Sequence, residues 1–120
     1  MTVGEVMVTD PQTVPADALV ADVRRAFEKP SQRTVLIAQD GIFLGTIERE
    51  SLPVDAAGSE RALPYAAREV PTATPQMPMS DAVALLDGRP EPRLVVLEEG
   101  GAHLSGLLCY NRGDEGFCVR

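Results

Sequence analysis

The sequence predicts an α/β fold that contains two copies of one supersecondary unit. Three observations support this prediction. The segment 13–27, TVPADALVADVRRAF, resembles the segment 72–86, TATPQMPMSDAVALL, which begins 59 positions later. Two glycines, Gly45 and Gly106, each follow an apolar strand and open a similar closing segment. The order of patterns is also the same in both halves, namely strand, helix, strand, hairpin, strand and the start of a helix.

In the first copy, Leu19, Val20, Val23 and Phe27 lie at helical spacing on one stripe, and Asp17 precedes them as the expected N-cap. Pro30 ends this helix. The apolar runs 34–38 and 42–47 are predicted to be strands, and the Asp-Gly pair at 40–41 forms the hairpin turn between them.

The second copy repeats these signals. Met79, Ala82, Val83 and Leu86 form its helical stripe, Pro78 suits the first turn, and residues 88–90 end the helix. Strands are expected at 94–97 and 103–109, around a Gly-Gly turn at 100–101. The shift between the copies is expected to grow to 60 at Arg33 and Arg93, and to 61 at the two glycines.

The segments outside the repeated strands and helices differ between the copies. The linker 51–64 is rich in Pro, Ala and Gly, and part of it should continue the last helix of the first copy. Short helical lead-ins are expected at 3–7 and 65–68. After Arg112, the residues Gly113, Asp114 and Gly116 disfavour a helix, so the second copy should lack its last helix and end in an extended tail.

Composition excludes several classes of function. The net charge is −7, from 18 acidic and 11 basic residues, and no Lys/Arg cluster suits nucleic acid. No apolar run approaches a membrane span and no secretory leader is visible, so we expect a cytoplasmic protein that binds neither membrane nor nucleic acid. In that reducing compartment Cys109 and Cys118 should be thiols.

The chemistry-bearing residues give little support to catalysis or to a metal site. His103 has no nucleophile motif around it, and the spacing of His103, Cys109 and Cys118 matches no zinc pattern. We therefore expect no enzyme, no metal and no required cofactor. The two cysteines are interpreted as buried structural thiols, with a redox switch between them as the alternative. Arg112 is interpreted as exposed or paired with Asp114 or Glu115, with an anion hook as the alternative.

Two stretches resemble the cystathionine-β-synthase (CBS) domain in its paired form, the Bateman module. VGEVMVTDPQTVPADALVADVRRAF (3–27) is similar to the opening of that domain, and DGIFLGTIERESL (40–52) is similar to its closing hairpin and signature. The second copy matches less fully, mainly from Ser80 to Leu108. The resemblance implies two β-α-β-β-α repeats, 1–58 and 59–120, packed with pseudo-twofold symmetry.

The resemblance also implies a function. Such pairs bind adenosine-type ligands (AMP, ATP or S-adenosylmethionine) in clefts between their repeats, form homodimers through helices, and regulate partner proteins. The family motif ends in a hydroxyl residue near phosphate and, three positions later, an Asp that binds ribose. Carried onto this chain, the implied ligand-binding residues are Thr13, Val14, Gly45, Glu48, Arg49, Ser51, Thr72, Gly106, Cys109 and Arg112.

Both closing signatures depart from the family pattern. The hydroxyl position holds Glu48 in the first copy and Cys109 in the second, and the Asp position holds Ser51 and Arg112. A carboxylate repels phosphate, Ser51 can still accept a bond from a ribose hydroxyl, and a guanidinium accepts none. We therefore expect the first copy to serve the ligand site. The alternative is a dimerising interaction scaffold whose ligand sites no longer bind.

Overall fold

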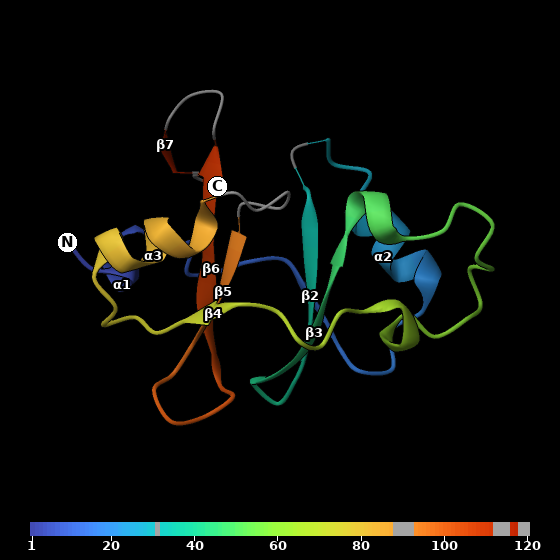
Figure 1. The fold of residues 1–120 in the computed structure, drawn as a ribbon. Helices are drawn as coiled ribbons and strands as arrows, with labels where there is room; N and C mark the ends of the chain where they lie inside the picture. The colour runs from blue at the N-terminus through green and yellow to red at the C-terminus, as the bar shows by residue number, and fades with distance from the viewer. Residues whose placement is uncertain (31, 88–92, 112–115, 118–120) are drawn as a thin grey trace. The chain divides into compact units, whose positions relative to one another are not determined.

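The computed structural model describes residues 1–30, 32–87, 93–111 and 116–117 (Figure 1). It divides into two compact units, which we call the first unit (residues 12–70) and the second unit (residues 1–11 and 71–120). Each unit combines a small sheet with a helix that packs on it, so the predicted α/β fold with two similar halves is confirmed.

The first unit contains a three-stranded mixed sheet in the order β1-β2-β3. β1 pairs parallel to β2, and β2 pairs antiparallel to β3. The predicted Asp-Gly turn joins β2 to β3, and both of its residues have positive φ. Its elements are β1 (Thr13–Val14), α2 (Val20–Ala26), β2 (Thr34–Gln39), β3 (Ile42–Glu48) and the 3-10 turns η1 (Arg49–Ser51) and η2 (Leu63–Tyr65).

The second unit repeats this topology and adds a fourth strand, in the order β4-β5-β6-β7. β4 pairs parallel to β5, and β6 pairs antiparallel to both β5 and β7. Its elements are α1 (Val3–Val6), β4 (Thr72–Ala73), α3 (Met79–Leu86), β5 (Arg93–Leu97), β6 (Leu104–Asn111) and β7 (Gly116–Phe117). The short β7 agrees with the expected extended tail as far as the described residues reach.

One face of each sheet packs on its helix. Because side chains alternate along a strand, Val35 and Ile37 of β2 reach Val23 of α2, and Leu94 and Val96 of β5 reach Ala82 of α3. Burial of each such side chain contributes about 1.5–3 kcal/mol. Most of both predicted helical stripes lies in these cores. The prediction is wrong for two residues of these stripes, because Leu19 is 37% exposed and Val83 is 44% exposed.

The start of α2 differs from the prediction. Asp17 is exposed and lies before the N-cap, which is Leu19. The side chain of the N-cap residue does not cap the helix. Instead, the backbone N–H of Leu19 donates to Oδ2 of Asp22, further along the chain, at 2.9 Å. Asp22 lies in the first helical turn, where a carboxylate is favoured by the helix dipole. The expected N-cap at Asp17 is therefore wrong.

The strand register corrects the expected alignment of the two copies. Thr34 pairs with Glu48 in the first unit, and Arg93 pairs with Cys109 at the equivalent place in the second. Thr34, not Arg33, therefore corresponds to Arg93, and the shift is still 59 along this strand. The two additional residues of the second copy lie in its hairpin, where Leu97 pairs with Leu104 while Ala38 pairs with Phe43.

A segment outside the paired strands packs on each sheet, and we call it an arm. The arm of the second unit lies within residues 1–11, and that of the first unit within residues 60–67. Val8 exchanges two backbone hydrogen bonds with Leu107 of β6, at 2.8 and 3.0 Å. Ala67 does the same with Thr46 of β3, at 2.9 and 2.8 Å. The units therefore do not coincide with the ranges 1–58 and 59–120 expected for the sequence repeats, because residues 1–11 pack with the second unit and 60–67 with the first. The repeat boundaries stay a prediction about the sequence.

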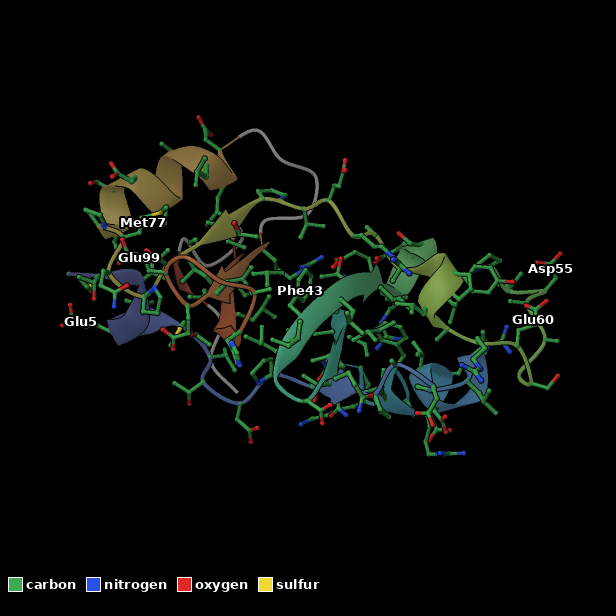
Figure 2. The ribbon with its side chains drawn as sticks, turned by 90° about the horizontal axis from the view of Figure 1, so that it is seen from below. Glu5, Phe43, Asp55, Glu60, Met77 and Glu99 are labelled. Carbon is green, nitrogen blue, oxygen red and sulfur yellow. The ribbon has the colours of Figure 1, made fainter. Side chains whose placement is uncertain are left out.

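Contrary to the expectation, the linker after β3 does not continue the last helix of the first copy. Only η1 is helical there, and η2 occupies part of the expected lead-in at 65–68. The linker is docked on α2: Nη2 of Arg24 donates to the backbone oxygens of Pro53, Val54 and Ala56 at 3.2, 3.2 and 2.5 Å. Figure 2 shows the side chains of Asp55 and Glu60 on this loop, and both are exposed.

Candidate functional site

The two signature glycines make room for the arms. A Cβ atom built on Gly106 would lie 2.5 Å from the backbone oxygen of Val8, and one on Gly45 would lie 2.8 Å from Cβ of Ala66. Contacts this short are essentially excluded for a real side chain, so the arm requires glycine at both positions. Packing of the arms therefore accounts for both glycines, which the resemblance implied as ligand-binding residues.

The closing segment of the first unit is fixed by a hydrogen bond across the sheet. Oγ1 of Thr34, a side chain only 3% exposed, donates to Oε2 of Glu48 at 2.6 Å. Because its acceptor is a carboxylate, this bond is stronger than a hydrogen bond between two neutral groups. It positions Glu48 at the end of β3, on the sheet face opposite to α2.

Arg49 is anchored in the next position. Its Nε and Nη2 donate to the backbone oxygen of Gln32 at 3.1 and 2.7 Å, and Nη2 donates to that of Lys29 at 2.8 Å. The guanidinium carbon also lies 5.1 Å from the centre of the Phe27 ring, within cation–π range. These contacts hold the loop after α2 against η1, so Arg49 has a structural role here. Ser51, at the end of η1, is exposed.

The closing segment of the second unit takes a different course. β3 ends at Glu48 and turns into η1, whereas β6 continues past the equivalent residue, Cys109, to Asn111. The backbone then pairs with β7 instead of entering a helical turn. Arg112, which corresponds to Ser51, lies outside the described residues. The two closing segments thus diverge at the position where their side-chain chemistry differs.

The remaining predicted site residues lie on both faces of the sheets. Thr13 and Thr72 are exposed residues of β1 and β4 at equivalent register positions, opposite Leu36 and Val95. Val14 lies on the other face, in the hydrophobic core with α2. In the first unit, the sheet face that bears Thr13 and Glu48 also bears the buried residue Thr46.

Two polar residues were missed by the sequence analysis. Thr34 was assigned only to an apolar strand run, and its partner was not foreseen because the pairing depends on register. Ser105 has a buried hydroxyl without a hydrogen-bond partner. It is the bulge residue before Gly106, and the equivalent Leu44 packs on the core of the first unit. The sequence did contain a signal for Ser105, since a polar residue stands there at the position where the first copy has Leu44.

The cysteine expectation is wrong for Cys109, which is disulfide-bonded and half-buried instead of being a thiol. Cys118 lies outside the described residues. His103 is exposed. Within the described parts of the chain, no three His, Cys, Asp or Glu side chains gather in a way that could hold a metal ion, and none of the helices has the length and apolarity to cross a membrane.

Comparison with known proteins identifies this arrangement. A protein-family model for the CBS domain matches residues 3–52, which include α1, the sheet of the first unit and η1. Residues 3–52 are a CBS domain. The fold likeness to solved CBS-pair structures extends over most of the chain, second unit included. No curated protein matches the sequence significantly.

Three solved structures illustrate this likeness. The CBS-pair protein CBSX2 from Arabidopsis thaliana superposes with a TM-score of 0.78 at 18% identity, over 94% of this chain and 89% of that one. A CBS domain pair/ACT domain protein from Thermotoga maritima gives 0.76 at 19% identity, over 89% and 88%. The cytosolic domain of the Mg²⁺ channel MgtE, in complex with ATP, gives 0.75 at 17% identity, over 88% of this chain and 44% of that one. At these identities the likeness concerns the fold.

Proposed function

We propose that the chain is a regulatory CBS-pair module that senses a small adenosine-type ligand and acts on a partner protein. The observation that carries the proposal is the closing segment of the first unit, where the Thr34–Glu48 bond and the anchored Arg49 present Ser51 at the surface. A fixed turn with an exposed hydroxyl suits recognition of a ribose, because little conformational freedom of the turn is lost on binding. The complex of the MgtE domain with ATP supports the ligand class.

The first unit is the better candidate for the ligand. Its sheet face bears polar side chains at Thr13, Thr46 and Glu48. The equivalent positions in the second unit are Thr72, Leu107 and the disulfide-bonded Cys109. A polar ligand needs hydrogen-bonding partners when it loses water, and the first face offers more of them.

The ligand should carry few phosphates. Glu48 brings a carboxylate to the position where the family motif has a hydroxyl near phosphate, and the repulsion of an anion grows with its charge. Adenosine and S-adenosylmethionine should therefore bind better than AMP, and AMP better than ATP. S-adenosylmethionine also carries positive charges that a carboxylate attracts.

The module is further proposed to act as a non-catalytic homodimer. Val83 and Leu85 of α3 are 44% and 43% exposed, which leaves apolar helix surface that a second copy could cover. Light scattering on a sizing column at tens of micromolar would test the dimer, and a monomer mass would contradict it.

Calorimetric titration with adenosine, AMP, ATP and S-adenosylmethionine tests the ligand and its site. Ser51→Asp restores the charged acceptor of the family motif and should tighten binding by up to about 1.5–3 kcal/mol, the range for a charged hydrogen bond. Arg112→Asp makes the matching change in the second copy and should tighten it less. Ser59→Asp, at an exposed linker position of the first unit, controls for the added negative charge.

Three results would contradict the proposal in different ways. Tightest binding to ATP would remove the role given to Glu48. Binding that responds to position 112 but not to position 51 would move the site to the second copy. Absence of binding in the parent and in all three variants would favour the alternative, a dimerising scaffold, for which the divergence of both closing signatures is the supporting observation.

A further inference from the structure

The methionines of this chain are unevenly distributed. All four, Met1, Met7, Met77 and Met79, belong to the second unit, and the sequence of the first unit contains none. Met7 and Met77 are half-buried and pack against the hydrophobic core that contains Met79. The N–H of Val3 donates to the backbone oxygen of Met77 at 2.9 Å, and that of Met79 to the backbone oxygen of Met1 at 3.0 Å. Methionines are therefore concentrated where the arm of residues 1–11 meets the second unit.

The sulfur of Met7 lies at the contact between this arm and β6. A Cβ atom built on Gly106 would lie 2.8 Å from Sδ of Met7 and 3.2 Å from its Cγ, so the thioether lies directly over the glycine. The next residue of the arm, Val8, exchanges two backbone hydrogen bonds with Leu107. Met7 is only half-buried, so part of the residue faces solvent. An oxidisable atom thus lies in a tight contact that is not sealed from water.

The arm of the first unit has the same place and different chemistry. A Cβ atom on Gly45 would lie 2.8 Å from Cβ of Ala66, and the next residue, Ala67, exchanges two backbone hydrogen bonds with Thr46. Ala66 therefore corresponds to Met7. Alanine has no atom that a mild oxidant attacks. The two arms differ in their sensitivity to oxidation, although they pack on their sheets in the same way.

We propose that Met7 makes the N-terminal arm sensitive to oxidation: a peroxide converts its thioether to the sulfoxide, and the arm then loosens from β6. The sulfoxide oxygen is polar and needs a hydrogen-bond donor or water, which a contact with the hydrophobic core does not supply. On the side of Gly106 there is not even room for a methyl group. The side chain must leave this contact, and the adjacent Val8–Leu107 bonds weaken with it. The inference is independent of the ligand proposal.

The chemistry is a two-electron oxygen transfer. A lone pair of the sulfur attacks one oxygen of hydrogen peroxide, the S–O bond forms and the O–O bond breaks. The departing hydroxide takes up the proton from the transferred oxygen and leaves as water. Sulfur is oxidised by two electrons and the peroxide is reduced. Methionine sulfoxide reductases reverse the change with electrons from thiols, so the oxidised arm can be restored.

Peroxide treatment of the full chain, followed by peptide mapping and hydrogen exchange, tests the sensitivity. Met7 should be oxidised faster than Met79, which is 7% exposed. As Met7 is oxidised, the amides of Val8 and Leu107 should exchange faster and the Tm should fall by about 5 °C. The amides of Thr46 and Ala67 are the internal control and should keep their rates. Unchanged exchange at Val8 and Leu107 in protein whose Met7 is fully oxidised would overturn the proposal.

Two leucine variants separate Met7 from the other methionines. Met7→Leu keeps the approximate volume and removes the sulfur, so its Tm and exchange should not respond to peroxide, even where Met1, which is 79% exposed, is oxidised. Met77→Leu is the matched control, because Met77 is also half-buried against the same core, and it should respond as the parent does. Met7→Leu that loses as much Tm in peroxide as the parent would overturn the role of Met7.

Reversal distinguishes a sensor from damage and needs no substitution. Treatment of the oxidised parent with methionine sulfoxide reductases of both stereospecificities should restore the Met7 thioether, the Tm and the slow exchange of Val8 and Leu107 together. Met7→Gln, which places a polar side chain of similar length there, should show the fast exchange without peroxide. Exchange that stays fast after Met7 is reduced again would overturn the proposed reversible sensitivity.

Discussion

The hydroxyl of Thr34 donates a 2.6 Å hydrogen bond to the carboxylate of Glu48, across directly paired positions of β2 and β3. The bond explains how an acidic residue is tolerated at the end of β3, on a sheet face where Leu36 and Thr46 are buried. In the second unit the paired residues are Arg93 and Cys109, so the same two backbone positions carry different chemistry.

Thr34→Val should lower the free energy of unfolding by about 1–2 kcal/mol, because it removes a donor to a charged group while keeping the shape of the side chain. Thr46→Val is the matched control on the same face, and it should cost less because Thr46 lies opposite Leu36 instead of a carboxylate. Urea unfolding of both variants provides the measurement. Equal losses would mean that the Thr34–Glu48 bond adds nothing specific.

Arg49→Ala should destabilise the first unit by about 2 kcal/mol, since it removes hydrogen bonds to two backbone oxygens and the contact with the Phe27 ring. Arg33→Ala is the control. Its ion pair with Glu50 spans 3.6 Å between side chains that are 61% and 67% exposed, so it should cost less than about 0.5 kcal/mol. Thermal unfolding that ranks Arg33→Ala as the costlier change would contradict the anchoring role of Arg49.

Local patterns in the sequence predict the strands, the Asp-Gly hairpin and most of the helical stripes, because these depend on neighbours along the chain. The N-cap at Leu19 was missed because Asp17 and Asp22 both flank the helix start, and only the backbone path selects between them. The sequence order of the elements could not show that residues 1–8 complete the second unit, since the Val8–Leu107 pairing joins distant segments. For the same reason, the sequence could not show that Gly45 and Gly106 lie against these segments.

Ser105→Ala should raise the free energy of unfolding by about 1 kcal/mol, because the buried hydroxyl of Ser105 has no hydrogen-bond partner and its desolvation is uncompensated. Ser80→Ala, at an exposed position of α3, is the control and should have little effect. Differential scanning calorimetry compares the two. A loss of stability in Ser105→Ala would indicate that the hydroxyl does make a bond in solution.

The N-terminal cap should make stability depend on pH. The backbone N–H and hydroxyl of Thr2 donate to Oε1 of Glu5 at 2.7 and 3.1 Å, and these bonds lower the pKa of Glu5 from its ordinary value of 4.5. A lowered pKa in the folded state means that the carboxylate stabilises the fold above pH 4.5 and loses this contribution as the pH falls through the lowered value.

Glu5→Gln, which mimics the protonated acid, should therefore reduce the Tm at pH 7 and make no difference at pH 2. The exposed Glu99, in the hairpin between β5 and β6, provides the control substitution Glu99→Gln, which should leave the Tm nearly unchanged at both pH values (Figure 2). A gap between Glu5→Gln and the parent that persists at pH 2 would show that the effect does not come from ionisation.

The arms themselves can be tested at the glycines. Gly106→Ala should destabilise the second unit by about 1–3 kcal/mol, because its Cβ would lie 2.5 Å from the backbone oxygen of Val8 and 2.8 Å from Sδ of Met7. Gly45→Ala should cost less, since a Cβ there would lie 3.1 Å from the nearest backbone oxygen, that of Ala67. Gly101→Ala meets nothing within 4 Å and is the control.

Hydrogen exchange locates the damage in these variants. Gly106→Ala should speed exchange of the amides of Val8 and Leu107, and Gly45→Ala those of Thr46 and Ala67, because these amides form the bonds between arm and sheet. A Gly106→Ala variant with parental Tm and parental exchange would mean that the arm does not pack against β6 in solution. A Gly45→Ala variant that keeps both properties but no longer binds the ligand would instead support the ligand-binding role implied by the family resemblance.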